Sequence, residues 1–357
     1  MPSELKIISG NSNRPLAEKI AARLKRPLTA CTVTRFSDGE VFVQIEENIR
    51  GSDLFVIQST NPPAENIMEL LMLIEAAKRA SARRITAVMP YFGYARADRK
   101  DQPRVSITAR LVANLITVAG ADRVLTMDLH ASQIQGFFDI PSDHLYSAMV
   151  FNEYFLKLGI SDPVVVAPDV GSIKMARAFA KTLGGGLAIV DKRRPHPNKA
   201  EVLHIIGEIE NKTVIMRDDM IDTAGTLTEA ARVVKERGAR EVYACCTHPV
   251  LSGSSLQRIA DSPIEKLVVA DTIDTSQRRL PDNIEVVTTT ALFAEAIARI
   301  ATEKSVSQLF PPEREIDVNA GRRAGTAKES GPIPEDAVRK QTPDRSNTPT
   351  APTGARS

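Results

Sequence analysis

The chain has 357 residues, of which 43% are hydrophobic, and its 46 basic and 44 acidic residues leave a formal net charge of +2. This length predicts about two domains, and the near-neutral charge argues against a basic nucleic-acid-binding surface. We find no pattern of a signal peptide, no apolar run that could span a membrane, and too few cysteines for a disulfide framework, so we expect a cytoplasmic protein.

Short apolar runs alternate with segments of helical periodicity along the chain. The predicted strands are 5–10, 53–60, 84–91, 123–130, 163–169, 186–192, 212–219, 241–248 and 266–272. The predicted helices are 15–24, 66–80, 106–118, 172–183, 226–237 and 291–304. Strands separated by helices of this length predict an α/β protein with parallel sheets and right-handed crossovers.

A weak internal repeat suggests two similar domains. Residues 108–130 align without gaps to residues 226–248, which pairs His130 with His248. Any helix–glycine–strand unit could match equally well, so coincidence is the alternative. We predict domains at 1–145 and 146–310, the second including the final helix. Beyond them apolar periodicity vanishes, and residues 311–357 are predicted to form a disordered tail.

The segment VIMRDDMIDTAGT, residues 214–226, joins an apolar strand, three acids and the start of a helix. Gly225 can adopt a positive φ and permits close backbone approach, and the first N–H groups of the helix can hold a phosphate. Asp218 and Asp219 can accept hydrogen bonds from sugar hydroxyls, directly or through Mg²⁺. A phosphorylated sugar satisfies both halves of the loop. The alternative is an acidic turn that caps a helix.

The segment DDMIDTAGT, residues 218–226, resembles the ribose 5-phosphate loop shared by phosphoribosyltransferases and ribose-phosphate diphosphokinases. Further segments within residues 5–310 resemble the bacterial diphosphokinases in particular. They are FSDGE (36–40), MELLMLIEAAKRASA (68–82), PYFGYARADRK (90–100), DLHASQIQGFFDIP (128–141), DKRRPHPN (191–198), EVYACCTHPVLSG (241–253) and SVSQLF (305–310).

This resemblance implies two tandem phosphoribosyltransferase-like domains, each a mainly parallel sheet flanked by helices. It implies an Mg²⁺-dependent transfer of the diphosphoryl group of ATP to the anomeric hydroxyl of ribose 5-phosphate, which gives 5-phosphoribosyl 1-diphosphate and AMP for nucleotide biosynthesis. It also implies a homo-oligomer, a hexamer by analogy with the family, without nucleic-acid or membrane partners.

The resemblance also implies roles for individual residues. The ribose 5-phosphate-binding residues are Asp218, Asp219, Asp222, Thr223, Ala224, Gly225 and Thr226. The ATP-binding residues are Phe36, Asp38, Glu40, Arg96, Arg99 and His130, with the hairpin residues serving a neighbouring subunit. The catalytic cations are Lys192 and Arg194 on a mobile flap, and the metal ligands are His130 and Asp169. A regulatory site would include Arg50, Asp143, Ser305, Ser307 and Phe310.

Taken by themselves, several of these residues have simpler interpretations. A histidine at the end of a strand often has a structural role, and the charged run at 191–198 is typical of a solvated loop. Asp38 and Gly39 are typical of a hairpin tip. Asp128 lies two residues before His130 in a predicted strand, so we expect both side chains on one face and treat Asp128 as a candidate supporting residue.

The chain departs from the bacterial pattern in four places: Ala97, Val105–Ser106, Ser172 and Met175. They put nucleotide affinity and regulation in doubt more than the reaction class. Two other functions remain open. A non-catalytic regulatory paralogue is disfavoured by the intact basic flap, and a phosphoribosyltransferase is disfavoured by FSDGE and by the absence of a recognisable base-binding hood.

Overall fold

The structure of the chain is a computed structural model that describes residues 4–167, 172–193 and 202–310. The predicted tail at 311–357 and the predicted site residues Asp169 and Arg194 lie outside the described residues. No helix in the described part of the chain is long and apolar enough to cross a membrane.

The N-terminal half is built on five parallel strands in the order β1-β4-β5-β6-β7. They are β1 (Leu5–Ser9), β4 (Asp53–Ile57), β5 (Arg84–Met89), β6 (Arg123–Met127) and β7 (Ser142–Leu145). The helices are α1 (Arg14–Arg23), α2 (Glu65–Arg79) and α3 (Thr108–Ala119), with a short 3-10 helix at Ser132–Phe137. The inner strand β4 is buried at every position, as expected for a parallel strand covered on both faces.

The second half is built on seven strands in the order β10-β9-β8-β11-β12-β13-β14, all parallel except the pair β9–β10. The strands are β8 (Pro163–Ala167), β9 (Gly186–Arg193), β10 (Val202–Ile206), β11 (Thr213–Ile221), β12 (Glu241–Pro249), β13 (Lys266–Ala270) and β14 (Ile284–Val287). The helices are α4 (Ala148–Leu158), α5 (Ile173–Leu183), α6 (Gly225–Glu236) and α7 (Ser255–Ala260).

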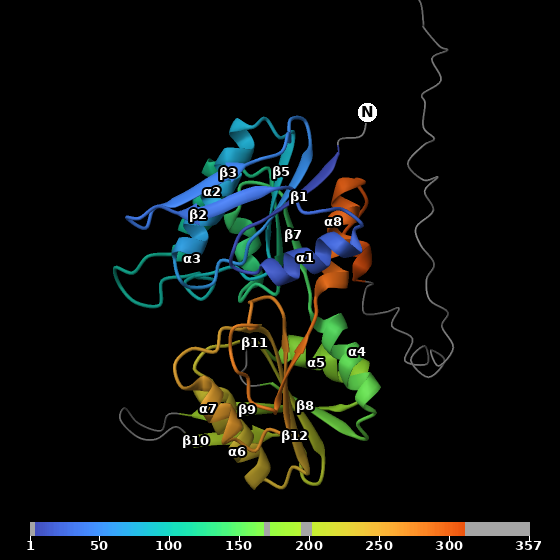
Figure 1. Ribbon diagram of the computed structural model, residues 1–357. Helices are drawn as coiled ribbons and strands as arrows, with labels where there is room; N and C mark the ends of the chain where they lie inside the picture. The colour runs from blue at the N-terminus through green and yellow to red at the C-terminus, as the bar shows by residue number, and fades with distance from the viewer. Residues whose placement is uncertain (1–3, 168–171, 194–201, 311–357) are drawn as a thin grey trace, which may run out of the picture. The chain divides into compact units, whose positions relative to one another are not determined.

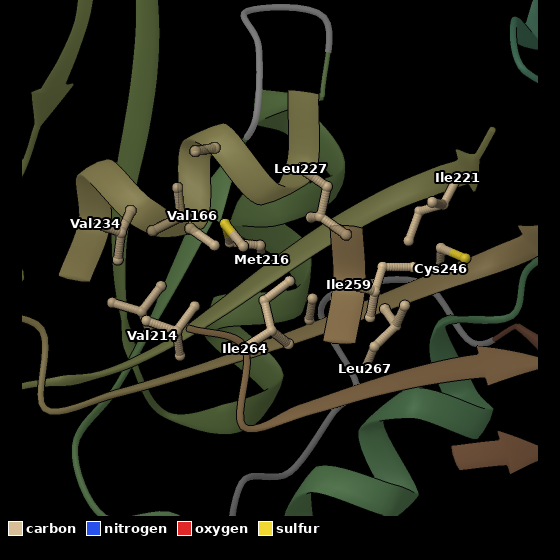
Figure 2. Close-up of a cluster of buried hydrophobic side chains, with 14 of the residues drawn as sticks. Val166, Val214, Met216, Ile221, Leu227, Val234, Cys246, Ile259, Ile264 and Leu267 are labelled. Carbon is tan, nitrogen blue, oxygen red and sulfur yellow. The ribbon is translucent and has the colours of Figure 1, made fainter. Parts of the chain in front are cut away.

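Alternation along β11 separates two cores in this half. Val214 and Met216 point to the face covered by α6 and α7, where Figure 2 shows them beside Leu227 and Ile259. Ile215 points to the opposite face, covered by α4 and α5. This period of two is what a strand buried on both faces requires, and it fixes which side chains β11 directs to each layer.

The last helix, α8 (Thr290–Ala301), joins the core of the N-terminal half. Its Phe293 and Ile297 are fully buried together with Leu16 and Ile20 of α1, and the two helices lie side by side in Figure 1. Sequence order had placed this helix in the second domain. The division at 1–145 and 146–310 stays a prediction. Near the end of the described residues, the chain returns to the core of the N-terminal half through α8.

The predicted parallel α/β architecture is confirmed. Several short elements were not predicted: β7, β10, β14, α4, α7 and the hairpin of β2 (Cys31–Arg35) and β3 (Val41–Ile45). Strands of four or five residues with half-exposed side chains carry too little apolar periodicity to be recognised.

Candidate active site

The candidate site lies where the carboxyl ends of β6 and β11 meet, which is the edge of parallel sheets where ligands commonly bind. His130 follows β6, and Asp218 and Asp219 lie near the end of β11. The Nδ1 atom of His130 is 2.8 Å from Oδ2 of Asp219. The structure thus joins a residue predicted for ATP to a residue predicted for the sugar, across 89 positions of sequence.

This contact favours a charged pair. The hydrogen bond to Asp219 raises the pKa of His130 above its ordinary value, although partial burial works against it. Burial alone would raise the pKa of Asp219, but the hydrogen bond with His130 and the charge of its imidazole hold that pKa below its usual value. The contact therefore shifts the balance toward a protonated imidazole beside a carboxylate.

The sugar loop bends at Ala224. This residue has a φ of 61° and precedes α6, whose first residue is Gly225. Our expectation of a positive φ at Gly225 was therefore wrong, since the left-handed conformation falls one residue earlier, on a side chain that tolerates it poorly. Such backbone strain is most often found at functional turns.

Asp222 is held from both sides. Its Oδ2 accepts a hydrogen bond from Arg96 at 2.8 Å, and its Oδ1 accepts one from the hydroxyl of Ser252. The bond from Ser252, followed by that from Arg96, lowers the pKa of Asp222. Arg258 of α7 donates to the backbone carbonyl of Thr223 at 3.0 Å. The loop is therefore braced before any ligand binds.

Sequence reasoning missed Ser252 and Arg258. The signal for Ser252 was present, because it lies in the segment that follows β12 and precedes a helix start. Arg258 is an ordinary helix residue in sequence, and its contact with Thr223 depends on how α7 packs beside α6.

The FSDGE segment forms the tip of the β2–β3 hairpin, as its local pattern predicted. The amide of Glu40 donates to Oδ1 of Asp38 at 3.0 Å, and the ring of Phe36 packs at 5.3 Å on Phe42 while remaining 54% exposed. Among the described residues, the hydrogen bonds and ring contacts of Phe36, Asp38 and Glu40 stay within the hairpin. The structure does not join them to His130, and Arg99 is likewise exposed.

The basic flap is described in part. Lys192 lies in β9 opposite Leu203 of β10, in the antiparallel pair that leads into and out of residues 194–201. Of the unusual positions, Ser172 precedes α5 and Met175 is half-buried within that helix. Ala97 uses its backbone N–H and C=O to bind Tyr94 and Ala109, so its side chain is not what shapes the loop.

Some of the predicted regulatory residues come together. Arg299 donates to the carbonyl of Ser305 at 3.0 Å, the hydroxyls of Ser305 and Ser307 are 3.2 Å apart, and Phe310 packs at 5.2 Å on Tyr146 just beyond β7. Asp143 in β7 binds Arg123. Arg50 precedes β4, and no contact among the described residues links it to the other four.

Asp128 lies in a buried polar cluster rather than beside His130 on one face. It has a φ of 36°, so the strand alternation on which our expectation rested ends at Met127. Asp128 is 6% exposed, whereas the side chain of His130 is 40% exposed. The partners of Asp128 come from the second half of the chain as well as the first, which no local pattern indicates.

Comparisons with known proteins agree with this geometry. A family model for the N-terminal domain of ribose phosphate pyrophosphokinase matches residues 5–120, and one for the phosphoribosyl synthetase-associated domain matches residues 193–311. The ribose-phosphate pyrophosphokinase of Chlorobaculum tepidum is 58% identical over 311 residues, which is 87% of this chain and 96% of that protein. The enzyme of Clostridium tetani is 57% identical over 310 residues, covering 86% and 97% of the two chains.

A solved structure is also similar over most of its length. The crystal structure of phosphoribosylpyrophosphate synthetase from Mycobacterium smegmatis superposes with a TM-score of 0.79 at 38% identity. The match covers 84% of this chain and all of that one. The similarity therefore extends over both sheets rather than over a single loop.

Proposed function

This chain belongs to the ribose-phosphate pyrophosphokinase family, and we propose how its residues divide the work of that family's reaction. The enzyme transfers the diphosphoryl group of ATP to the anomeric hydroxyl of ribose 5-phosphate, which yields 5-phosphoribosyl 1-diphosphate and AMP for nucleotide biosynthesis. The observation that supports our assignment of roles is the contact of His130 with Asp219, since it places the predicted ATP side against the predicted sugar side.

On the sugar side, Asp218 and Asp219 accept hydrogen bonds from the ribose hydroxyls. The 5-phosphate binds the backbone N–H groups that open α6, where the helix dipole favours an anion. The carboxylate of Asp222 would repel this phosphate if it stood free. Its hydrogen bonds with Ser252 and Arg96 supply the compensating donors.

On the ATP side, Arg96, Arg99 and His130 bind the phosphates. The anomeric oxygen attacks the β-phosphorus in line with the departing AMP oxygen, so that one phosphorus–oxygen bond forms while the other breaks. Lys192 and Arg194 act as cations that stabilise the charge on the transferred group, rather than as bases. Exclusion of water from the site during transfer would protect ATP from hydrolysis.

The residues of the site are compatible with Mg²⁺. Asp218 and Asp219 present hard oxygen donors side by side, and Mg²⁺ typically takes one or two protein carboxylates together with water and substrate phosphate oxygens. Within the described residues no group of three or more acidic, histidine or cysteine side chains is preassembled as a closed metal site, which suits an ion that arrives with its nucleotide. When bound, the metal would neutralise charge on the transferred phosphates, with His130 and Asp169 as its further proposed ligands.

We propose that the protein acts as a homo-oligomer, a hexamer, in which the hairpin tip of one subunit completes the ATP site of its neighbour. The exposed ring of Phe36 and the self-contained tip support this arrangement, because the tip is already formed and has an aromatic face available for a purine. We place the enzyme in the cytoplasm, because its three cysteines are free thiols and its substrates are nucleotide precursors.

The proposed function is tested by incubating the purified protein with ATP, Mg²⁺ and ribose 5-phosphate. We expect equal amounts of AMP and 5-phosphoribosyl 1-diphosphate. Lys192→Ala should lower kcat by roughly a thousandfold while ribose 5-phosphate still binds, because it removes a cation that acts on the transferred group. Lys157→Ala is the matched control, since Lys157 lies on α4 in an exposed pair with Glu153.

The alternatives predict other results. A non-catalytic paralogue would form the oligomer and make no AMP. A phosphoribosyltransferase would consume 5-phosphoribosyl 1-diphosphate in the presence of a nucleobase. If Lys192→Ala retained kcat within about tenfold of the wild type, a loss of only ~1.4 kcal/mol, the role given to Lys192 would be wrong.

A further inference from the structure

Two charged contacts join the segment at the end of β6 to β11. They lie two residues apart in sequence on both segments. Asp128 pairs with Arg217 at 3.9 Å, and two residues further along each segment His130 pairs with Asp219 at 2.8 Å. The first pair is buried, with side chains 6% and 2% exposed, whereas the second is open to solvent. The two contacts form consecutive rungs between the segments that carry the site.

The backbone around Asp128 is fixed at several points. Its own N–H donates to the carbonyl of Leu145 at 3.0 Å, and its carbonyl lies 3.1 Å from Nε2 of His248, which must donate because a carbonyl can only accept. The next amide, of Leu129, donates to Nε2 of His144 at 3.0 Å. These bonds hold Asp128 in its left-handed conformation, which an L-residue does not adopt without cost.

The carboxylate of Asp128 is equally constrained. One of its oxygens accepts from the amide of Ser147 at 3.2 Å, from the hydroxyl of Ser147 and from the hydroxyl of Thr247 at 2.7 Å. Thr247 and His248 belong to β12, which is the parallel neighbour of β11. Asp128 is therefore tied to β12 and, through Arg217, to β11, the strand whose end carries Asp218 and Asp219.

A gain in folding stability does not explain why Arg217 is buried. Its guanidinium is buried against the rings of Phe151 and Phe179, at 5.9 and 4.9 Å, and its Nε has no hydrogen-bond partner among the residues that the structure describes. A buried ion pair of this kind is commonly no more stable than apolar side chains of similar size, so its contribution is better sought in specificity.

We propose that the buried Asp128–Arg217 pair is a positioning device that holds His130 and Asp219 at their working separation. The inference rests on the proposed function, because it assigns that separation to the alignment of ATP with the sugar. Asp128 and Arg217 touch neither substrate, and they act through the two residues that follow them by two positions. Loss of the pair should therefore impair the alignment reached in the transition state more than substrate binding.

The test compares Arg217→Met with the wild type. Methionine fits the aromatic surroundings, so we expect a folded protein whose melting temperature changes by a few degrees. We expect kcat to fall by at least tenfold, with both KM values within about threefold. The double variant Asp128→Asn with Arg217→Met leaves no unpaired carboxylate in the interior and should show the same loss of kcat. It provides the test if the single variant does not fold.

The control is the partly buried pair of Asp53 with Arg84 at the amino ends of β4 and β5, away from the site. Arg84→Met should lower the melting temperature and leave kcat within about twofold of the wild type. The proposal is overturned if Arg217→Met keeps kcat within about twofold, or if kcat falls equally in Arg84→Met.

A second measurement does not depend on activity. Hydrogen exchange of the segments 128–131 and 218–221 should be faster in Arg217→Met than in the wild type, and unchanged in Arg84→Met. Unchanged exchange in the first variant would overturn the positioning role even if the wild type proved inactive. An inactive wild type with the expected exchange pattern would count against the proposed function instead.

Discussion

At the scale of single residues, the site depends on how charges are paired. His130, Asp219, Arg96 and Asp222 neutralise one another across the two halves of the chain. Two residues predicted to bind ATP phosphates, His130 and Arg96, thus form ion pairs with two acids predicted to bind the sugar phosphate, Asp219 and Asp222. Substrates that bring their own phosphates and hydroxyls would exchange these contacts for new ones of the same kind, which limits the desolvation cost of binding.

The His130–Asp219 pair leads to a prediction about pH. The hydrogen bond raises the pKa of His130, so the pair stabilises the folded state fully below the unfolded pKa of histidine and loses this effect as pH rises through the folded pKa. The lowered pKa of Asp219 sets the acid limit, because the effect is also lost as pH falls through that value. The melting temperature of His130→Gln should therefore lie below that of the wild type near pH 6 and approach it near pH 9.

The matched control is His204→Gln, since His204 is exposed on β10. Its difference from the wild type should not depend on pH in this range. A difference for His130→Gln that stayed constant or grew with rising pH would mean that the pair is not charged in the way described.

At the scale of elements, the two sheets present the site and the helices brace it. β11 carries Arg217, Asp218 and Asp219 near its end, α6 supplies the N–H groups of the sugar loop, and α7 supports that loop through Arg258. The β2–β3 hairpin stands apart from this arrangement, with a preformed tip. We therefore expect the two halves of the ATP site to come from different elements and different subunits.

Helix α8 gives a prediction about stability. Phe293 is fully buried against α1, so Phe293→Ala should lower the free energy of unfolding by about 3–5 kcal/mol through lost burial and a residual cavity. Urea unfolding measures this change, and hydrogen exchange should increase in α1 rather than in β12. Val286→Ala on the exposed side of β14 is the control and should cost less than about 0.5 kcal/mol. Faster exchange in β12 with an unaffected α1 would contradict this packing.

At the scale of the whole molecule, the proposed sharing of the ATP site between subunits predicts that activity depends on assembly. Phe36→Ala removes the aromatic ring that a subunit contributes to the ATP site of its neighbour. Lys192→Ala removes a cation from the subunit's own site. Each variant should be nearly inactive alone. Dissociated, mixed and reassembled in equal amounts, they should recover about a quarter of wild-type activity, because random pairing places an intact cleft beside an intact tip at that frequency.

The measurement is the steady-state rate of AMP formation before and after reassembly. Wild-type protein taken through the same treatment is the control for recovery. Mixtures no more active than the separate variants, with reassembly verified, would show that each subunit uses its own hairpin.

The sequence by itself determined the alternation of strands and helices, the acidic loop with its helix start, and the family. These features are local, since periodicity, turn residues and motif order are written in consecutive positions. Much of the site could be named in advance for the same reason: His130, Asp219 and Asp222 each end a readable strand or open a loop. The hairpin tip at Asp38 and Gly39 was recognised from its turn residues alone.

The tertiary structure decided what depends on long-range packing. The pairing of Asp128 with Arg217, the bracing of Thr223 by Arg258 and the return of α8 to the first core each join residues far apart in the chain. The left-handed turn at Ala224 is another such case, because local preference pointed to the neighbouring glycine. Propensity is a weak bias that sheet register and packing readily override, so the residues that align the site became visible only once both sheets were assembled.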